Sequence, residues 1–210
     1  MWPLLWLNSH FLESWVEDDM DKRASKTRDA IIAAWMALLP EKKNQRITVT
    51  ELAKRANIAR KTFYLHYETP EDVMRDASRR KLEELLAILD QKGFFENPFD
   101  TETLFQCLNE LMEPNIDFYR QLSRGTPDSY FWSELKRMMI RLITEIYGSR
   151  MDFPEAELRL YAEYFVSGVM AVYLSWLQGE LSLSFDELAR LASEATFHGI
   201  RKSRKTGDGL

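Results

Sequence analysis

Apolar residues recur at intervals of three and four along the chain, which is the spacing of the buried face of a helix. Glycine (8) and proline (7) are scarce among the 210 residues, so few turns are available. The pattern favours an all-α fold of long helices over a many-stranded sheet. The longest periodic segments predict helices over residues 25–39, 70–90, 101–112, 115–122, 130–147, 155–178 and 185–200.

Shorter helices are predicted between the first two of these. One apolar stripe, which includes Ile31, runs along 25–39, and Pro40 is expected to end that helix. Thr48-Val-Thr-Glu51 then forms a capping box that starts a short helix. In such a box the Thr hydroxyl accepts from the Glu amide, and the Glu carboxylate accepts from the Thr amide.

A tight turn should join this helix to another. Asn57 is expected at the turn, because Asn tolerates the left-handed backbone of a sharp reversal. The next helix, from Arg60 to about Tyr67, should bury Phe63 and Tyr67. Its outward side chains are cationic, polar or aromatic: Arg60, Lys61, Thr62, Tyr64 and His66. Two short helices joined in this way predict a helix-turn-helix, whose second helix fits the major groove of DNA.

Charge is distributed unevenly along the chain. Residues 20–66 hold eleven Lys and Arg against four Asp and Glu, a balance of +7 in a chain of net charge −5. The remainder therefore carries −12. A basic head on an acidic body is the asymmetry expected when only one end of a protein meets a polyanion.

The segment Ile47–Val73, ITVTELAKRANIARKTFYLHYETPEDV, resembles the DNA-binding signature of the TetR family of transcriptional regulators. A threonine-capped helix, an Ala-x-x-Ala spacing, a turn, Thr-x-Tyr and a final aromatic pair follow in the family's order, and the match is dense from Lys26 to Met74. The resemblance implies that Arg60 and Lys61 address bases or nearby phosphates. It also implies that phosphates are held by Thr48, Thr62, Tyr64 and His66, whose hydroxyls and imidazole are suitable donors.

The chain departs from the family pattern at four positions. Asn57 replaces the usual turn glycine, and Ala59 replaces the serine that caps the recognition helix. Lys61 replaces a glycine and adds a long cation to the expected DNA face. Pro70 replaces a common lysine and puts one phosphate contact in doubt, although Thr69-Pro70-Glu71 is a good helix start.

The predicted architecture is an N-terminal three-helix, helix-turn-helix head on a C-terminal helical bundle for dimerisation and effector binding. Its expected parts are an N-terminal extension (1–19), the DNA-binding domain (20–68), a connecting helix (69–92), the regulatory and dimerisation domain (93–203) and a disordered tail (204–210). For the extension, two readings stay open: Met20 is the native start, or the first residues form a short amphipathic addition.

The segment 155–178 carries two apolar stripes, which implies burial on two sides. We expect this helix and the one over 185–200 to pair with their copies in a homodimer, as the resemblance also implies. The alternative is that both stripes serve the core of one subunit. The expected interface residues are Phe165, Val169, Val172, Tyr173, Leu188, Leu191 and Ala195.

Family members commonly hold a small effector in the body. Large apolar side chains there are candidates for lining such a pocket, with core packing as the competing interpretation for each. These candidates are Met112, Phe118, Tyr119, Trp132, Met139, Tyr164 and Trp176.

Catalytic and metal-binding chemistry is not predicted. The three histidines are scattered, and no phosphate-binding loop, dinucleotide fingerprint or nucleophile elbow occurs. Cys107 is the only cysteine, which favours a reducing, cytoplasmic location without disulfides. No cofactor is expected. No membrane contact is expected either, because the longest uncharged apolar stretch is shorter than the roughly 20 residues of a spanning helix.

Together these features predict a sequence-specific regulator of transcription that binds double-stranded DNA. A repressor released from a palindromic operator by an unidentified small molecule is the first interpretation. An activator or co-activator controlled by a partner protein is the second. A helical adaptor without DNA binding is the alternative from another class.

Overall fold

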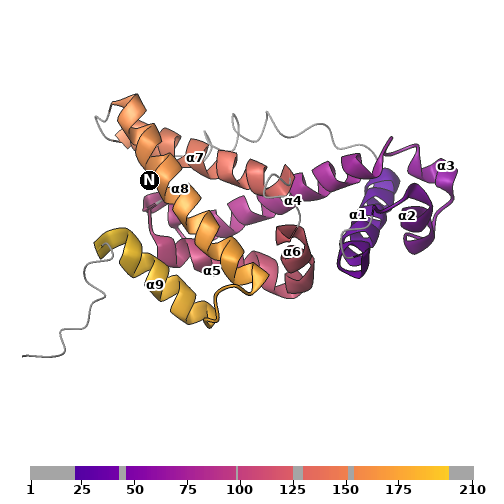
Figure 1. Cartoon of the computed structure of the whole chain (residues 1–210). Coiled ribbons are helices and arrows are strands. Elements are labelled where there is room, and N and C mark those ends of the chain that lie inside the picture. The colour runs from indigo at the N-terminus through magenta and orange to yellow at the C-terminus, as the bar shows by residue number, and fades with distance from the viewer. Residues whose placement is uncertain (1–21, 43–45, 98, 125–129, 151–153, 199–210) are drawn as a thin grey trace, which may run out of the picture.

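The computed structural model describes residues 22–42, 46–97, 99–124, 130–150 and 154–198. The molecule is elongated, with α1 (Lys22–Lys42), α2 (Val49–Arg55) and α3 (Arg60–Phe63) at one end (Figure 1). The long helix α4 (Pro70–Gln91) leads from this head into the body. The expected extension (1–19) and tail (204–210) lie outside the described residues.

Among the described residues, the body is formed by five further α-helices and two short 3₁₀ turns. Their bounds are η2 (Phe94–Glu96), α5 (Thr101–Met112), η3 (Glu113–Asn115), α6 (Ile116–Ser123), α7 (Tyr130–Arg150), α8 (Glu155–Gln178) and α9 (Phe185–His198). The prediction of an all-α fold with a three-helix head and a helical body is confirmed.

Side-chain caps explain where several helices begin. The Thr69 hydroxyl accepts from the Asp72 amide, and Pro70 occupies the first turn of α4. In the same way Asp100 accepts from the Thr103 amide, 3.2 Å away, at the start of α5. The starts predicted for these two helices are therefore confirmed.

Two predicted helix ends are wrong. Pro40 lies inside α1, which continues to Lys42, because a proline in the last turn removes only one bond of the helical ladder. Gly148 lies inside α7, which continues to Arg150, because no proline interrupts the ladder before Pro154.

One continuous hydrophobic core runs from the head through α4 into the body. Trp35 of α1 meets Phe118 of α6 edge-to-face, with ring centroids 5.4 Å apart. Inside the body, Phe105 of α5 packs on Tyr173 of α8 at 5.5 Å. The head is thus packed against the body through side chains as well as joined to it by α4.

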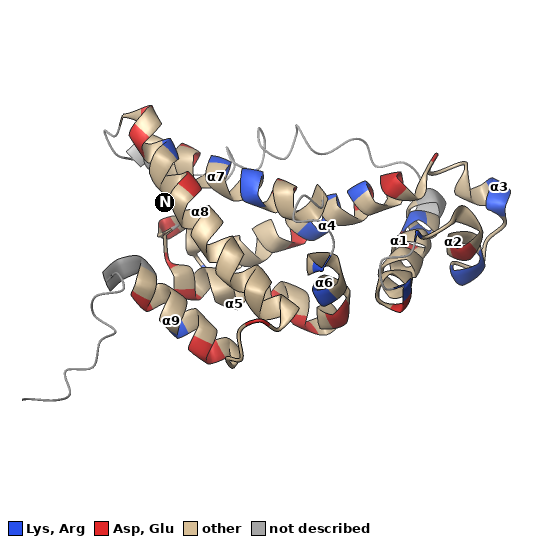
Figure 2. Ribbon diagram, in the orientation of Figure 1, with Lys and Arg blue, Asp and Glu red and all other residues tan. Residues whose placement is uncertain are grey.

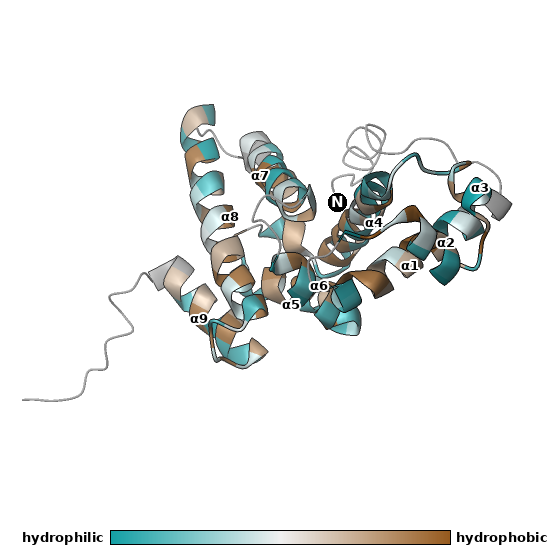
Figure 3. Cartoon of the chain, turned by 45° about the vertical axis from the view of Figure 1, so that its right-hand side comes forward, coloured by the Kyte–Doolittle hydropathy of each residue, from teal (hydrophilic) through white to brown (hydrophobic). Residues whose placement is uncertain are grey.

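The helix α8 has one buried and one exposed side. Leu158, Phe165 and Tyr173 are buried against the rest of the subunit, whereas Leu160 and Tyr164 are exposed. Hydrophobic positions occur along the whole length of α8 (Figure 3). Among the described residues, α8 is long and apolar enough to cross a membrane by length and composition alone, a test that core helices also pass.

Candidate nucleic-acid interface

The capping box at the start of α2 is present. The Glu51 carboxylate accepts from the Thr48 amide at 3.0 Å and from its hydroxyl at 2.8 Å, while the Glu51 amide donates to that hydroxyl at 3.3 Å. The Lys42 ammonium of α1 also pairs with Glu51. Hydrogen bonding from Lys42 and Thr48 lowers the pKa of Glu51 from 4.5 to about 2, so the box is charged at neutral pH.

The turn between α2 and α3 is a Schellman motif. Asn57 has φ of 54°, in the left-handed region, as predicted. The Ile58 amide donates to the Ala53 carbonyl at 2.9 Å, and the Asn57 amide donates to the Lys54 carbonyl at 3.3 Å. These bonds use carbonyls that would otherwise be unpaired at the helix end, and they fix the angle at which α3 leaves the turn.

The recognition helix is shorter than predicted. It ends at Phe63, and the next residues form a tighter turn in which the Leu65 and His66 amides donate to carbonyls three positions earlier. Ala59 supplies no side-chain cap, as its departure from the family pattern implied. Phe63 is fully buried, and Ala53 of α2 is also buried. One side of this short segment is therefore fixed in the core.

The same segment carries exposed cations that are available for a ligand. Arg60 and Lys61 are exposed, and within the described part of the chain neither forms an ion pair. By contrast, Arg55 pairs with Glu41 at 2.5 Å and Arg46 pairs with Glu71 at 3.2 Å. Positive charge marks α3 at the outer end of the head (Figure 2).

Tyr67 ties the end of the recognition segment to α4. Its hydroxyl donates to the Asp76 carboxylate at 2.6 Å, and Arg79 donates to the same carboxylate at 3.0 Å. Arg80 contacts Asp76 at 3.4 Å and also pairs with Asp29 of α1. Burial and the hydrogen bond to Asp76 raise the pKa of Tyr67, so its hydroxyl stays protonated as the donor. Three helical segments of the head are joined by this network.

The expected phosphate-binding side chains differ in their availability. Tyr64 is 52% exposed, Thr62 and His66 are partly exposed, and Thr48 already donates its hydroxyl proton to Glu51. Burial, and next the charge of Arg28, lower the pKa of His66, so a neutral imidazole would face DNA with one N–H to donate.

Sequence reasoning missed one exposed residue of this segment. Leu65 is 74% exposed and lies between Tyr64 and His66. The sequence does indicate this, because Leu65 is an apolar residue between two residues that are expected to face outward. An exposed apolar side chain here is suited to contact a thymine methyl group or a sugar.

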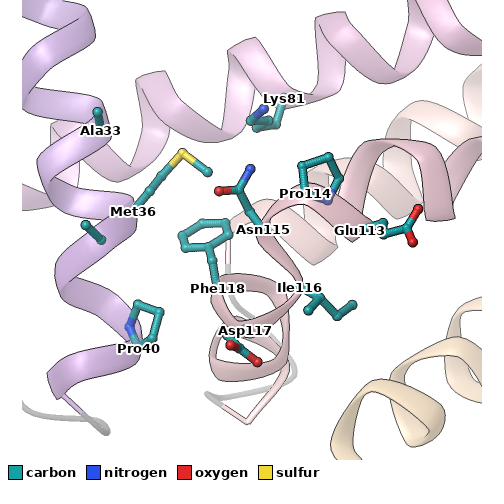
Figure 4. Close-up of a pocket in the computed structure, with 11 residues that line it drawn as sticks. Ala33, Met36, Pro40, Lys81, Glu113, Pro114, Asn115, Ile116, Asp117 and Phe118 are labelled. Atoms are coloured by element: carbon teal, nitrogen blue, oxygen red, sulfur yellow. The ribbon is translucent and has the colours of Figure 1, made fainter.

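The body candidates do not gather around one cavity. Met112, Tyr119, Trp132 and Met139 are buried in the core, and Tyr164 is 83% exposed. Trp176 is partly buried, and its indole N–H donates to the Leu183 carbonyl at 2.9 Å. A pocket of about 440 Å³ lies instead between α1, α4 and the start of α6, and Phe118 is the one candidate that lines it (Figure 4).

The expected dimer residues fall into two groups. Phe165, Val169, Tyr173 and Leu188 are buried inside the subunit, so their side chains serve its own core. The others are exposed on the outer sides of α8 and α9: Val172, Leu191 and Ala195.

Metal-binding side chains do not cluster among the described residues. No group of three or more His, Cys, Asp and Glu side chains there is arranged to hold a metal ion. Cys107 is buried, and burial raises the pKa of its thiol to about 11.

A helix-turn-helix head on a helical body defines the class of two-part helical transcriptional regulators. Residues 100–197 match a TetR family model described as the transcriptional regulator C-terminal region. The HTH-type transcriptional regulator YxbF of Bacillus subtilis (strain 168), itself uncharacterized, is 25% identical over 162 residues, covering 75% of this chain and 41% of YxbF. This C-terminal part of the chain is thus similar to that of TetR-family transcriptional regulators, and the chain spans less than half the length of YxbF.

Solved structures share the fold. The dihydroxyacetone kinase operon activator DhaS superposes with a TM-score of 0.56 at 16% identity, covering 84% of this chain and 97% of DhaS. The multidrug binding protein EbrR, complexed with imidazole, superposes with a TM-score of 0.57 at 14% identity, covering 80% of this chain and 88% of EbrR. At these identities the likeness describes the fold alone.

Proposed function

We propose that the protein is a cytoplasmic, homodimeric repressor that reads a near-palindromic operator with α3 and leaves it when an effector binds. The observation that carries this proposal is the exposed pair Arg60 and Lys61. Both lie on the segment that buried Phe63 anchors in the core, and neither is neutralised by a described acidic side chain. A rigid cationic edge of this kind suits the major groove.

Arg60 and Lys61 are assigned to bases and adjacent phosphates. Arg can bind the O6 and N7 of guanine in a bidentate pair, whereas Lys acts as a point charge. Thr62, Tyr64 and His66 are assigned to phosphates, which set the register of the head on the duplex. The Thr48 amide and hydroxyl both donate to Glu51, so a phosphate contact from Thr48 would require its hydroxyl to leave Glu51.

The proposed dimer face lies on the exposed sides of α8 and α9. Leu160 and Tyr164 are exposed on α8, and the side chains of Val172 and Leu191 are more than a third exposed. A side chain placed at Gly168 would meet no atom within 4 Å, so the middle of this face is open to a partner helix. Pairing two copies would bury these apolar side chains and place two recognition segments roughly 34–36 Å apart on adjacent turns of DNA.

The test is selection of bound fragments from the host genome by the wild type and by the Arg60→Ala and Lys61→Ala variants. Loss of a base contact costs about 1–3 kcal/mol and should relax the preference at the corresponding base pairs. Lys54→Ala is the matched control, because Lys54 is an exposed head cation outside α3. It should weaken binding to all sequences equally, and unchanged site preference in both α3 variants would remove their assignment.

A second function is favoured by one feature of the body. Met112, Tyr119 and Trp132 are buried in the core, and none of them lines the pocket between α1, α4 and α6, so these side chains do not themselves point to room for a small molecule in the body. An activator or co-activator controlled by a partner protein needs no such room. Operator binding is measured after addition of either the small-molecule fraction or the protein fraction of host lysate. A change caused by the small-molecule fraction supports the effector-controlled repressor, and a change caused by the protein fraction supports the partner-controlled regulator.

A further inference from the structure

The pocket of Figure 4 lies where the head meets the body. Ala33, Met36, Ala37 and Pro40 of α1 form one wall, and residues 113–118 of η3 and α6 form the other. Lys81 of α4 also lines the pocket. Its volume of about 440 Å³ falls within the range of small-molecule sites. A molecule bound here would contact the head and the body together.

The walls offer an apolar surface of ordered side chains. Phe118 is buried and held edge-to-face by Trp35, with ring centroids 5.4 Å apart. The Met36 side chain lies beside Phe118 in the pocket, and its flexible thioether adapts to different shapes (Figure 4). An aromatic or short aliphatic group fits against these two residues.

Another part of the pocket lining is polar and includes a cation. Lys81 is the one cation among the described residues that line the pocket, and its ammonium pairs with Glu84 at 2.6 Å. An ammonium has three N–H donors, so two remain for a ligand. The Asn115 carboxamide makes no capping bond to α6 and lies between Met36, Lys81 and Pro114 in Figure 4. Together they offer several donors to one oxygen-bearing group.

The two acidic lining residues lie at the rim. Glu113 and Asp117 are exposed, and their carboxylates are directed away from the centre of the pocket in Figure 4. Asp117 is paired with Arg120 at 3.5 Å. The charged group left for a ligand in the lining is therefore the Lys81 ammonium, which Glu84 already contacts.

We propose that this pocket is a regulatory site for a small amphipathic carboxylate. The carboxylate binds the Lys81 ammonium and the Asn115 amide, and the apolar part lies on Met36 and Phe118. The site is separate from the body interior, and its existence does not depend on DNA binding. Because α1 and α6 both line it, its ligand stabilises one position of the head relative to the body and changes operator affinity by linkage.

The test uses three probes with the same phenylpropyl body: 3-phenylpropanoate, 3-phenylpropan-1-ol and 3-phenylpropan-1-amine. Each is titrated into the full chain labelled with ¹³C at the methionine methyl groups, and Met36→Leu assigns the Met36 signal. The carboxylate should shift that signal at the lowest concentration, followed by the alcohol. Equal titration by all three probes, preference for the amine, or no shift would overturn the proposal.

Three variants locate the site. Lys81→Gln should weaken the carboxylate about fivefold, as expected for a partly exposed charge-assisted contact, and should abolish its advantage over the alcohol. Lys92→Gln is the matched control, because Lys92 also pairs with a carboxylate, at 3.0 Å to Glu110, but lies outside the pocket. Ala37→Phe should fill the groove and abolish the shift, while retained binding in that variant would contradict the site.

Coupling to the head is measured separately. The carboxylate is titrated into free protein and into protein saturated with the selected duplex, and the two dissociation constants should differ. Equal constants would overturn the regulatory role. A Met36 shift in a protein that binds no duplex would support the site and contradict the DNA-binding proposal, so the two failures are distinguishable.

Discussion

Replacing Tyr67 with Phe removes the hydroxyl that joins the recognition segment to α4 and leaves the ring in place. That hydroxyl donates to Asp76 at 2.6 Å, and both side chains are largely buried. A hydrogen bond to a charged group contributes about 1.5–3 kcal/mol. Since Asp76 keeps Arg79 and Arg80, we expect the lower end, about 1.5 kcal/mol.

Urea unfolding followed by circular dichroism measures this loss. With an m-value of about 2 kcal/mol/M, a loss of 1.5 kcal/mol moves the midpoint by about 0.7 M. Wild type and variant are compared at one protein concentration, because the stability of a dimer depends on concentration.

Tyr64→Phe is the matched control for the same chemical change. Tyr64 is exposed and its hydroxyl has no bond to a described residue, so its removal should leave the urea midpoint unchanged. It should instead lower DNA affinity by about 1 kcal/mol per subunit through a lost phosphate contact. Equal midpoints for Tyr67→Phe and wild type, or a destabilised Tyr64→Phe, would refute this reasoning.

The pH dependence of the Tyr67→Phe variant gives an independent check. Burial opposes ionisation of Asp76, but the hydrogen bonds from Tyr67 and Arg79 and the charge of Arg80 lower its pKa overall. A carboxyl group whose pKa is lowered on folding stabilises the protein at pH values above its ordinary pKa. This contribution to stability is lost as the pH falls through the pKa of the folded state. Tyr67→Phe should therefore lose less stability than wild type between neutral pH and acid.

Three further predictions concern the head and the dimer. Asn57→Gly should preserve or raise stability, whereas Asn57→Val should cost about 1–2 kcal/mol in urea unfolding because φ is 54°; equal effects would contradict the turn. Because the pKa of Glu51 is about 2, its capping contribution to stability is lost as the pH falls from 4.5 toward 2. In the Glu51→Gln variant, the stability of the head should therefore depend less on pH over that range in acid unfolding. Val172→Arg should shift sedimentation toward monomer without lowering helicity, since Val172 is exposed on α8; an unchanged dimer would place the interface elsewhere.

Local chemistry explains which parts of the fold could be predicted. The ranges 101–112 and 155–178 were predicted to the residue, because periodicity coincides there with an Asp100 cap and with Pro154 and Gly179. Gly179 adopts φ of 81° at the helix end. The Thr48–Glu51 box was predictable for the same reason, since it depends on residues three apart.

Features that depend on tertiary contacts were harder to predict. Periodicity placed two stripes on α8 but could not say which faces the core, so Phe165 and Tyr173 were assigned to a partner although they are buried in the subunit. The Tyr67–Asp76 bond joins residues nine positions apart on different segments, and the pocket at Lys81 combines three helices. Neither arrangement leaves a periodic signal in the sequence.

The central claim is that the cationic edge of α3 reads base pairs. Equilibrium binding of the full chain to its selected duplex and to a scrambled duplex, over a series of salt concentrations, tests it most directly. We predict at least about 10³-fold tighter binding to the selected duplex, with affinity for both falling linearly in log–log plots against salt. Equal affinity for the two duplexes at every ionic strength would contradict the account.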